Sequence, residues 1–478
     1  MASSADATDA ADYGLLSPVW AGTAGAAQTG DRRIIQAMLD VELEWLRVLA
    51  GAGVIDPSLP DDAAPSCRAE LYDPASLAAR SAGGGNPVIP LLADLRAQVR
   101  HTSPSAAEAV HTAATSQDIL DTALMLIAAE SVDGILGDAR RTMSALAGLA
   151  AEHRSTLCVA RTLTQHSLPT TFGLRAAQWL QGMGQAAEAL QTAAARLPLQ
   201  WGGASGTLAA LRAAVDARGS AAAPLELADE LAVRLGLAAP PAPWQGNRLP
   251  VAAIGAALQD LLAAAGKIAN DVLLMSRPEV GEVSEPRAAG RGGSSAMPQK
   301  RNPVLSVLIR SAALAGPGFG VQLQTAAGAA DDERPGGSWH AEWQALRSLL
   351  RLASGAAGKL AELTEGLTVN TGALQENLAA AGPLVVSERL MATVAPLLEE
   401  AGPGSGKARL QALVSASQTT GDSLAALLRK AVPAQMLSDA ELAAQLDPAN
   451  YVGEAAALID RILAAYPVVA AHPVRSSR

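Results

Sequence analysis

Aromatic side chains are scarce in this chain of 478 residues, where they make up 3% and include only two phenylalanines. The core must therefore be built from aliphatic side chains, and alanine and leucine abound. Because alanine has the highest helix propensity and lets helices pack closely, the composition predicts an all-α fold. Hydrophobic residues make up 49% and charged residues 17%, which excludes a disordered or fibrous chain.

Basic residues are also in deficit, with 36 Lys and Arg against 46 Asp and Glu, so the formal net charge is −10. This argues against a nucleic-acid partner, since the phosphate backbone demands a basic surface. The cysteines, Cys67 and Cys158, are too few for a disulfide framework and suit a reducing cytosol. The N-terminus lacks a signal-peptide pattern and no stretch of about 20 apolar residues is expected to span a membrane, so we expect a soluble cytoplasmic protein.

Patterns that bind cofactors are missing too. The six histidines show no HxxxH spacing and no clustering with cysteine, so we expect no metal site. No GxGxxG follows a strand pattern, so we expect no nucleotide cofactor. The prediction is therefore a protein that works without cofactors.

The length of the chain suggests about three domains. We predict an N-terminal helical domain at residues 1–107, a central domain of long helices at 108–353 and a C-terminal helical domain at 354–478. Apolar residues in helical spacing predict helices over about residues 35–49, 88–100, 120–150, 174–197, 225–235 and 251–274, and one from residue 346. Residues 161–173 are predicted to form a loop, and residues 331–343 a polar break.

The stretch richest in chemistry is Gly290–Pro303, which reads Gly-Arg-Gly-Gly-Ser-Ser-Ala-Met-Pro-Gln-Lys-Arg-Asn-Pro. Its glycines allow backbone angles closed to other residues, so the segment could move and wrap a ligand. Ser294 and Ser295 could donate to a ligand or attack it. Lys300 would hold negative charge, and Asn302 could donate to an oxyanion. An ordinary polar surface loop is the alternative.

A second block, His111–Asp121, places polar residues at the start of a long helix. Thr115 followed by Asp118 is a capping-box pattern. Thr115 and Ser116 would then lie at a helix N-terminus, which favours bound carboxylates, although a cap without any ligand fits equally well. Upstream, Asn86 follows three glycines and could lie in a ligand-facing turn or in a plain helix linker.

A third block, Arg161–Gly173, is too polar and too interrupted for a buried helix. His166 within it titrates near neutrality and could move a proton in catalysis. A lone histidine is more often a structural hydrogen-bonding residue.

Gly293–Pro303 resembles, at every fixed position, the Gly-Ser-Ser-x-Met-Pro-x-Lys-x-Asn-Pro signature of the fumarase/aspartase superfamily. The three blocks follow one another in that superfamily's order, and the resemblance covers about residues 15–400. It implies three mostly helical domains, with the long helices of four copies joined in a twenty-helix bundle. It also implies active sites assembled from three copies, so we expect a homotetramer that acts on a small polycarboxylate.

The chemistry that this resemblance implies is anti elimination or addition next to a carboxylate. Ser294 matches the family's base, which removes a proton from carbon and must be activated by N–H groups or by Lys300. Lys300 and Asn302 match residues that hold the substrate carboxylate, and so do Thr115 and Ser116. The dianion formed on proton removal needs dense hydrogen bonding.

Within the superfamily the chain is most similar to the bacterial 3-carboxy-cis,cis-muconate cycloisomerases. The similarity rests on Arg161–Gly173, Glu282–Pro286 and the stretch that begins at Glu333-Arg334. It implies that a substrate carboxylate adds to a double bond to give 4-carboxymuconolactone in aromatic degradation. Adenylosuccinate lyases and fumarases usually have a proton-handling histidine where this chain has Leu163, so His166 becomes the candidate for proton handling or substrate orientation.

Two departures leave a second reaction open. Alanine replaces a glycine usual in the His111–Asp121 block, and Trp244-Gln245-Gly246 replaces Trp-His-Thr. The alternative is a lyase that eliminates a group from a substituted succinate and releases fumarate, nitrosuccinate lyase-like or adenylosuccinate lyase-like. A non-catalytic structural scaffold is a further alternative, against which the intact signature argues.

The three blocks and their neighbours give the candidate site. The catalytic candidates are Ser294, His166 and Lys300. The candidate substrate contacts are Asn86, Thr115, Ser116, Arg161, Thr162, Gln165, Arg248, Ser295, Met297 and Asn302.

Overall fold

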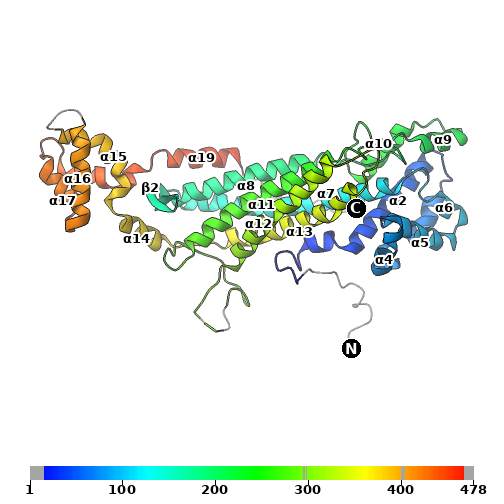
Figure 1. The fold of residues 1–478 in the computed structure, drawn as a ribbon, viewed down its shortest axis with the longest axis horizontal. Helices are drawn as coiled ribbons and strands as arrows, with labels where there is room; N and C mark the ends of the chain where they lie inside the picture. The colour runs from blue at the N-terminus through cyan, green and yellow to red at the C-terminus, as the bar shows by residue number, and fades with distance from the viewer. Residues whose placement is uncertain (1–14, 294–295, 298, 400–403, 468–478) are drawn as a thin grey trace. The chain divides into compact units, whose positions relative to one another are not determined.

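The computed structural model describes residues 15–293, 296–297, 299–399 and 404–467. Helices make up most of it, which confirms the all-α prediction, and the strands of the described residues form two short antiparallel pairs (Figure 1). The chain divides into two compact units. Unit 1 comprises residues 1–139, 185–269 and 305–361, and unit 2 comprises residues 140–184, 270–304 and 362–478. The division into three domains stays a prediction.

Unit 1 opens with short helices and continues into long ones. The first are α1 (Ala24–Gln28), α2 (Asp31–Gly51), α3 (Leu59–Ala63), α4 (Pro74–Gly84), α5 (Val88–Arg100) and α6 (Pro104–Ala109), followed later by α9 (Ala209–Ala217) and α10 (Pro224–Leu235). The long helices are α7 (Ser116–Glu152), α8 (Phe172–Ala194), α11 (Leu249–Met275), α12 (Val304–Gly328) and α13 (Ser338–Glu365), and each contributes residues to both units.

Unit 2 combines two strand pairs with a set of short helices. The strands are β1 (Leu157–Thr162) with β2 (Gln165–Thr171), and β3 (Val283–Ser284) with β4 (Thr368–Val369). The helices are α14 (Thr371–Ala381), α15 (Ser387–Thr393), α16 (Ser405–Thr420), α17 (Leu424–Ala431), α18 (Asp439–Leu446) and α19 (Ala455–Ala465). Buried leucines and valines such as Val386, Leu390, Leu410 and Leu428 form the core among these helices.

The helical periodicity predicts these elements well. The helix predicted over residues 88–100 coincides with α5, and the apolar face from Leu120 to Ala150 of α7 is buried except at Met143. The polar break predicted over residues 331–343 is wrong in its second half, because α13 already begins at Ser338. Its first turns carry Trp339 and Glu342, which are buried, so polarity there marks an internal network rather than a loop.

Small residues let α11 and α12 pack closely side by side (Figure 1). A Cβ added at Gly255 or Gly266 of α11 would lie 2.5 or 2.6 Å from Leu323 or Ala313 of α12. A Cβ added at Gly316 would lie 2.6 Å from Leu262 in the opposite direction. Helix backbones can approach this closely only where side chains are absent or small, as the scarcity of aromatic residues predicts.

By length and composition alone, α11 and α12 are apolar enough to cross a membrane. We expected no stretch of about 20 apolar residues that could span a membrane, and these two helices do meet that criterion of length and composition. Within the described chain 56% of the apolar window of α11 is buried, and 33% of that of α12.

Candidate functional site

Residues 161–173 form most of an antiparallel hairpin, not the predicted loop. β1 pairs with β2 so that Arg161 lies opposite His166, and Thr162 opposite Gln165. The polar residues that exclude a buried helix are compatible with an exposed hairpin, because its strands can face water. The structure thus brings these four candidates to one place, the end of the hairpin.

The hairpin turns through two residues, Leu163 and Thr164. Both have positive φ, at 48° and 71°, which is the conformation of a two-residue type I′ turn. Residues other than glycine, asparagine and aspartate rarely adopt it. Leu163 is 96% exposed, so the hairpin presents a hydrocarbon side chain at its tip.

Glu282 anchors the hairpin through Arg161 and is completely buried. Its carboxylate accepts hydrogen bonds from Arg161 at 2.9 and 2.6 Å and from Asn377 of α14 at 2.9 Å. Arg175 of α8 lies 3.8 Å away. The hydrogen bonds to Glu282 raise the pKa of Arg161. Arg161 therefore ties the hairpin to the residue that precedes β3, at the start of the segment that leads to the signature.

The signature segment closes on itself through a short backbone pairing. Asn302 N–H donates to the carbonyl of Gly292 at 2.9 Å, and Gly293 pairs with Arg301. Gly292 has a φ of 69°, and a Cβ added there would lie 2.6 Å from the carbonyl oxygen of Asn302. Glycine is therefore required at position 292 for the loop to close.

Of the candidates on this loop, Lys300 and Met297 are exposed and Asn302 is half-buried. Lys300 N–H donates to the carbonyl of Met297 at 3.0 Å. Ser294 and Ser295 lie outside the described residues.

At the start of α7, Asp118 is buried and collects four N–H donors. It accepts from Thr115 N at 3.0 Å, from Gln200 Nε2 at 3.1 Å, and from the backbone of Gly202 and Gly203 at 2.9 Å each. Burial raises the pKa of Asp118 to about 7, against the opposing effect of these donors. The hydrogen bond from Thr115 N–H to the Asp118 carboxylate is one of the two bonds that make up the predicted capping box.

The hydroxyl of Thr115 contacts Arg334. Arg334 Nη2 donates to Thr115 Oγ1 at 2.5 Å, and the arginine is exposed. Ser116, the first residue of α7, is half-buried beside it in sequence. An exposed guanidinium over the N-terminus of a long helix can bind a carboxylate, because both present N–H donors and positive charge. Arg334 was not among the candidates, although it belongs to a stretch that carries the family resemblance.

Asn86 lies in the turn before α5, and its side chain serves that helix. Its Oδ1 accepts from the backbone N–H groups of Val88 and Ile89 at 3.1 and 3.4 Å, and the residue is buried. The neighbouring Gly85 faces α13, since a Cβ added there would lie 3.6 Å from His340 Nε2. The exposed His340 ring also lies 5.1 and 4.8 Å from the rings of Trp339 and Trp343, measured between centroids.

Arg248 is buried at the centre of a polar network. It donates to both oxygens of Asp121 at 2.7 and 3.0 Å and to Glu342 at 2.8 Å. Trp339 Nε1 donates to Asp121 at 2.8 Å. Burial raises the pKa of Glu342 to about 7. With 1% of its surface exposed, Arg248 joins α7 and α13 from the residue before α11, which is a structural use of this candidate.

Among the described residues, no group of three or more His, Cys, Asp and Glu side chains is arranged to hold a metal ion. The candidate groups described in unit 1 are the Arg334–Thr115 contact and the start of α7. In unit 2 they are the hairpin end and the signature loop.

Comparison with known proteins adds to this geometry. A family model described as lyase matches residues 86–316. The nitrosuccinate lyase of Streptomyces davaonensis is 45% identical over 94% of either chain. A 3-carboxy-cis,cis-muconate cycloisomerase of Bradyrhizobium diazoefficiens is 37% identical over 94% of this chain and 97% of its own. The crystal structure of 3-carboxy-cis,cis-muconate lactonizing enzyme from Pseudomonas putida superposes with a TM-score of 0.84 at 33% identity, covering 93% of this chain and 96% of the other.

Proposed function

Because this chain belongs to the fumarase/aspartase superfamily, we propose that it expels a weakly basic group from a substituted succinate and releases fumarate. The 45% identity to a nitrosuccinate lyase over 94% of the chain supports nitrosuccinate as the substrate. The reaction breaks a C–H bond next to one carboxylate and the C–N bond on the adjacent carbon. The proton passes to the enzyme's base, and the C–N electron pair departs with nitrite.

The observation that carries this proposal is Leu163 at the hairpin tip, where it is 96% exposed. A hydrocarbon side chain cannot donate a proton. Amines and hydroxide are strong bases that leave poorly without one, whereas nitrite is a weak base that leaves as an anion. A site with leucine at this position therefore favours a leaving group that is a weak base and departs as an anion, such as nitrite.

The positive charge that this reaction needs would come from separate blocks of the chain. We propose that Arg334 and the start of α7 of one copy of the chain hold one carboxylate of the substrate. Lys300 and Asn302 of another copy would hold the other carboxylate, next to which negative charge develops. Ser294 would act as the base, and His166 would orient the substrate.

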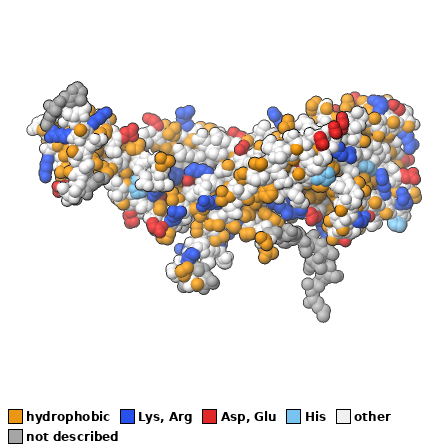
Figure 2. All heavy atoms as spheres, viewed as in Figure 1, with side chains coloured by type: hydrophobic (Ala, Val, Ile, Leu, Met, Phe, Trp, Pro, Cys, Tyr) orange, Lys and Arg blue, Asp and Glu red, His pale blue; other side chains and the backbone are white. Residues whose placement is uncertain are grey.

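We further propose a homotetramer, which is supported by an apolar stripe on α12. Val307, Leu314 and Val321 recur every seven residues and are 49%, 72% and 64% exposed. Figure 2 shows hydrophobic side chains along the surface that the central helices form. A stripe at this spacing is the pattern of a helix that packs on a neighbouring helix. Different copies of the chain would then contribute the three blocks of each active site.

The test is to mix the protein with 2-nitrosuccinate and follow the ultraviolet absorbance of fumarate together with released nitrite. We expect the two products in equal amounts. Aspartate and malate, whose leaving groups need a proton, should give no fumarate. Ser294→Ala should abolish turnover while the oligomer stays intact. Equal rates on aspartate and nitrosuccinate would contradict the role given to Leu163, and full activity in the serine variant would contradict the assignment of the base.

A second candidate reaction is the cycloisomerisation of 3-carboxy-cis,cis-muconate. It is supported by the Bradyrhizobium relative, 37% identical over 94% of this chain, and by the lactonizing enzyme with a TM-score of 0.84. In that reaction the nucleophile is part of the substrate, so no leaving group requires a proton. Rapid loss of the diene absorbance of this substrate, with no release of fumarate from nitrosuccinate, would favour it over elimination.

A further inference from the structure

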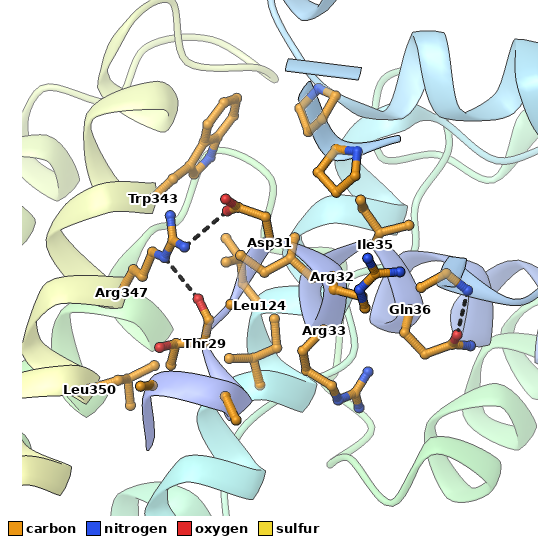
Figure 3. A pocket seen from close by; sticks show the side chains of 18 of the residues that line it. Thr29, Asp31, Arg32, Arg33, Ile35, Gln36, Leu124, Trp343, Arg347 and Leu350 are labelled. Carbon is orange, nitrogen blue, oxygen red and sulfur yellow. Dashed lines mark hydrogen bonds and ion pairs between the residues drawn. The ribbon is translucent and has the colours of Figure 1, made fainter. Parts of the chain in front are cut away.

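Unit 1 contains a cavity of about 1070 Å³ that no step of the proposed reaction uses. It lies between the N-terminal residues of α2 and the middle of α13, with α7 at its base (Figure 3). Thr115, Ser116 and Arg334 are not among its lining residues. We call it the α2–α13 cavity.

The lining of this cavity carries more positive than negative charge, in contrast to the chain as a whole. The charged residues of the wall are Arg32, Arg33, Arg347 and Arg351 against Asp31 and Glu70, whereas the whole chain has a formal net charge of −10. Arg33 forms ion pairs with Asp40 and Glu130, which do not line the cavity, so the excess of positive charge that attracts an anion comes from the other three arginines.

Two arginines of α13 are held in place by Thr29. Arg347 Nε donates to the carbonyl of Thr29 at 2.8 Å, and its Nη2 contacts Asp31 at 2.9 Å. Arg351 donates to the hydroxyl of Thr29 at 2.8 Å and lies over the ring of Trp20, 4.4 Å from its centroid. Both guanidinium groups are therefore ordered before any ligand arrives, which reduces the entropy lost on binding.

Two hydrogen-bond donors on α13 have no acceptor among the described residues. One is Nη1 of Arg347, and the other is the buried Nε1 of Trp343, one helical turn earlier. In Figure 3 the guanidinium of Arg347 lies between Trp343 and Thr29. Across from it α2 begins at Asp31, and Gly30 before it supplies no side-chain cap. A buried N–H without an acceptor is costly, so Trp343 Nε1 indicates a place for an anionic oxygen, to which the partly exposed guanidinium of Arg347 can also donate.

Part of the cavity wall is apolar. Leu124, Leu350 and Met38 line it and are at least nine-tenths buried, and the ring of Trp20 forms part of the wall. A ligand with one charged end and an apolar body would match both parts of the wall.

We propose that the α2–α13 cavity is a second ligand site, which binds a monocarboxylate with an apolar ring or chain. Its carboxylate accepts hydrogen bonds from Trp343 Nε1 and Arg347 Nη1, and its apolar body packs against Leu124 and Leu350. The site is separate from the groups that the reaction uses, so its occupation does not depend on which reaction the enzyme catalyses.

The test is calorimetric titration of the full-length protein with 2-naphthoate. Its uncharged analogue 2-naphthamide tests the need for the carboxylate, and saturating fumarate tests separation from the active site. We expect 2-naphthoate to bind with or without fumarate, and the amide to bind about tenfold or more weakly. Displacement by fumarate, equal binding of the amide, or no binding at millimolar 2-naphthoate would each overturn the proposal.

Variants locate the site. Trp343→Phe keeps an aromatic ring but removes the indole N–H, and Arg347→Gln removes the positive charge. Each variant should therefore bind 2-naphthoate more weakly. Ala27→Trp places a large ring at an exposed lining position and should abolish binding. Ala24→Trp, at an exposed position of the same helix that does not line the cavity, is the matched control and should bind normally. Unchanged binding in Ala27→Trp, with a melting temperature equal to that of the control, would exclude this cavity.

Discussion

Arg334 adds a positive charge to the start of α7, where Thr115 and Ser116 supply hydroxyl groups. Its donor reaches Thr115 at 2.5 Å across 219 residues of sequence. The capping pattern predicts the local half of this arrangement, the bond from Thr115 to Asp118, because it involves neighbours in sequence. No local pattern predicts the arginine, since its position depends on how α13 and the preceding turn pack against α7.

Replacing Arg334 tests its role as a carboxylate contact. Arg334→Gln should raise KM for the substrate about tenfold or more, because a charge-assisted hydrogen bond is lost while the fold is unchanged. Arg212→Gln is the matched control, since Arg212 is exposed and bonds only within its own helix. Steady-state kinetics measure both. An unchanged KM for Arg334→Gln would remove this residue from the site.

Two of the candidates, Asn86 and Arg248, show why residue type alone does not determine a role. Asn86 has the polarity of a ligand contact but uses its oxygen to cap α5, and Arg248 has the charge of one but is enclosed by Asp121 and Glu342. Sequence identifies both as unusual polar residues. Burial, which decides whether such a side chain faces a ligand or the interior, follows only from the packing of helices distant in the chain.

At the scale of elements, closure of the signature loop depends on Gly292 more than on Gly293. Gly292→Ala should open the loop, because alanine at positive φ costs about 1–2 kcal/mol and its Cβ would meet the carbonyl oxygen of Asn302 at 2.6 Å. Gly293→Ala should be tolerated, since nothing lies within 4 Å of a Cβ there. We expect faster limited proteolysis within residues 290–303 and loss of activity in the first variant only. Equal behaviour of the two would contradict the closure described here.

The helices were more predictable than the hairpin for a physical reason. Helical spacing places apolar residues of α5 and α7 on one face, and that face is buried, so the pattern predicts the structure directly. β1 begins with four apolar residues, of which Cys158 and Val159 are buried, and β2 carries mostly polar residues, so neither strand shows the alternation that marks a half-buried strand. Their pairing relies on Glu282, a buried carboxylate far along the chain, whose partnership with Arg161 no local pattern reveals.

At the scale of the whole molecule, the stripe on α12 should hold copies of the chain together. Leu314→Glu places a charge at a position that is 72% exposed in the single chain, so it should not unfold the chain but should dissociate the oligomer. Leu225→Glu, at a leucine of α10 that is 64% exposed, serves as the control. Light scattering after size exclusion gives the mass of each variant. A tetramer in both would exclude α12 from the interface.

Stability should fall as the pH rises toward neutrality. Burial raises the pKa values of Asp118 and Glu342 to about 7, whereas in the unfolded chain both titrate near 4. The folded state therefore holds more protons between these values, and its stabilisation is complete below about pH 4 and lost as the pH passes 7. We expect the free energy of unfolding to decrease by about 2 kcal/mol from pH 5 to pH 7 through Asp118.

Urea titrations across that range measure this slope. Asp118→Asn should flatten it, because the amide does not titrate, whereas Asp61→Asn at an exposed site should not. An equal slope in Asp118→Asn and the unaltered protein would contradict the raised pKa of Asp118.

In the hairpin, the backbone frame of the two paired strands and the exposed Leu163 side chain at the two-residue turn depend on different contacts. Strand pairing and the anchor at Glu282 fix the frame, while the side chain at the tip lies in open space and makes little contribution to holding it. Descendants of such a protein could exchange that side chain, and with it the kind of bond they break, at almost no cost in folding. A change in the length of the turn would instead shift the register that sets Arg161 opposite His166, so a new chemistry is more accessible here by substitution than by insertion.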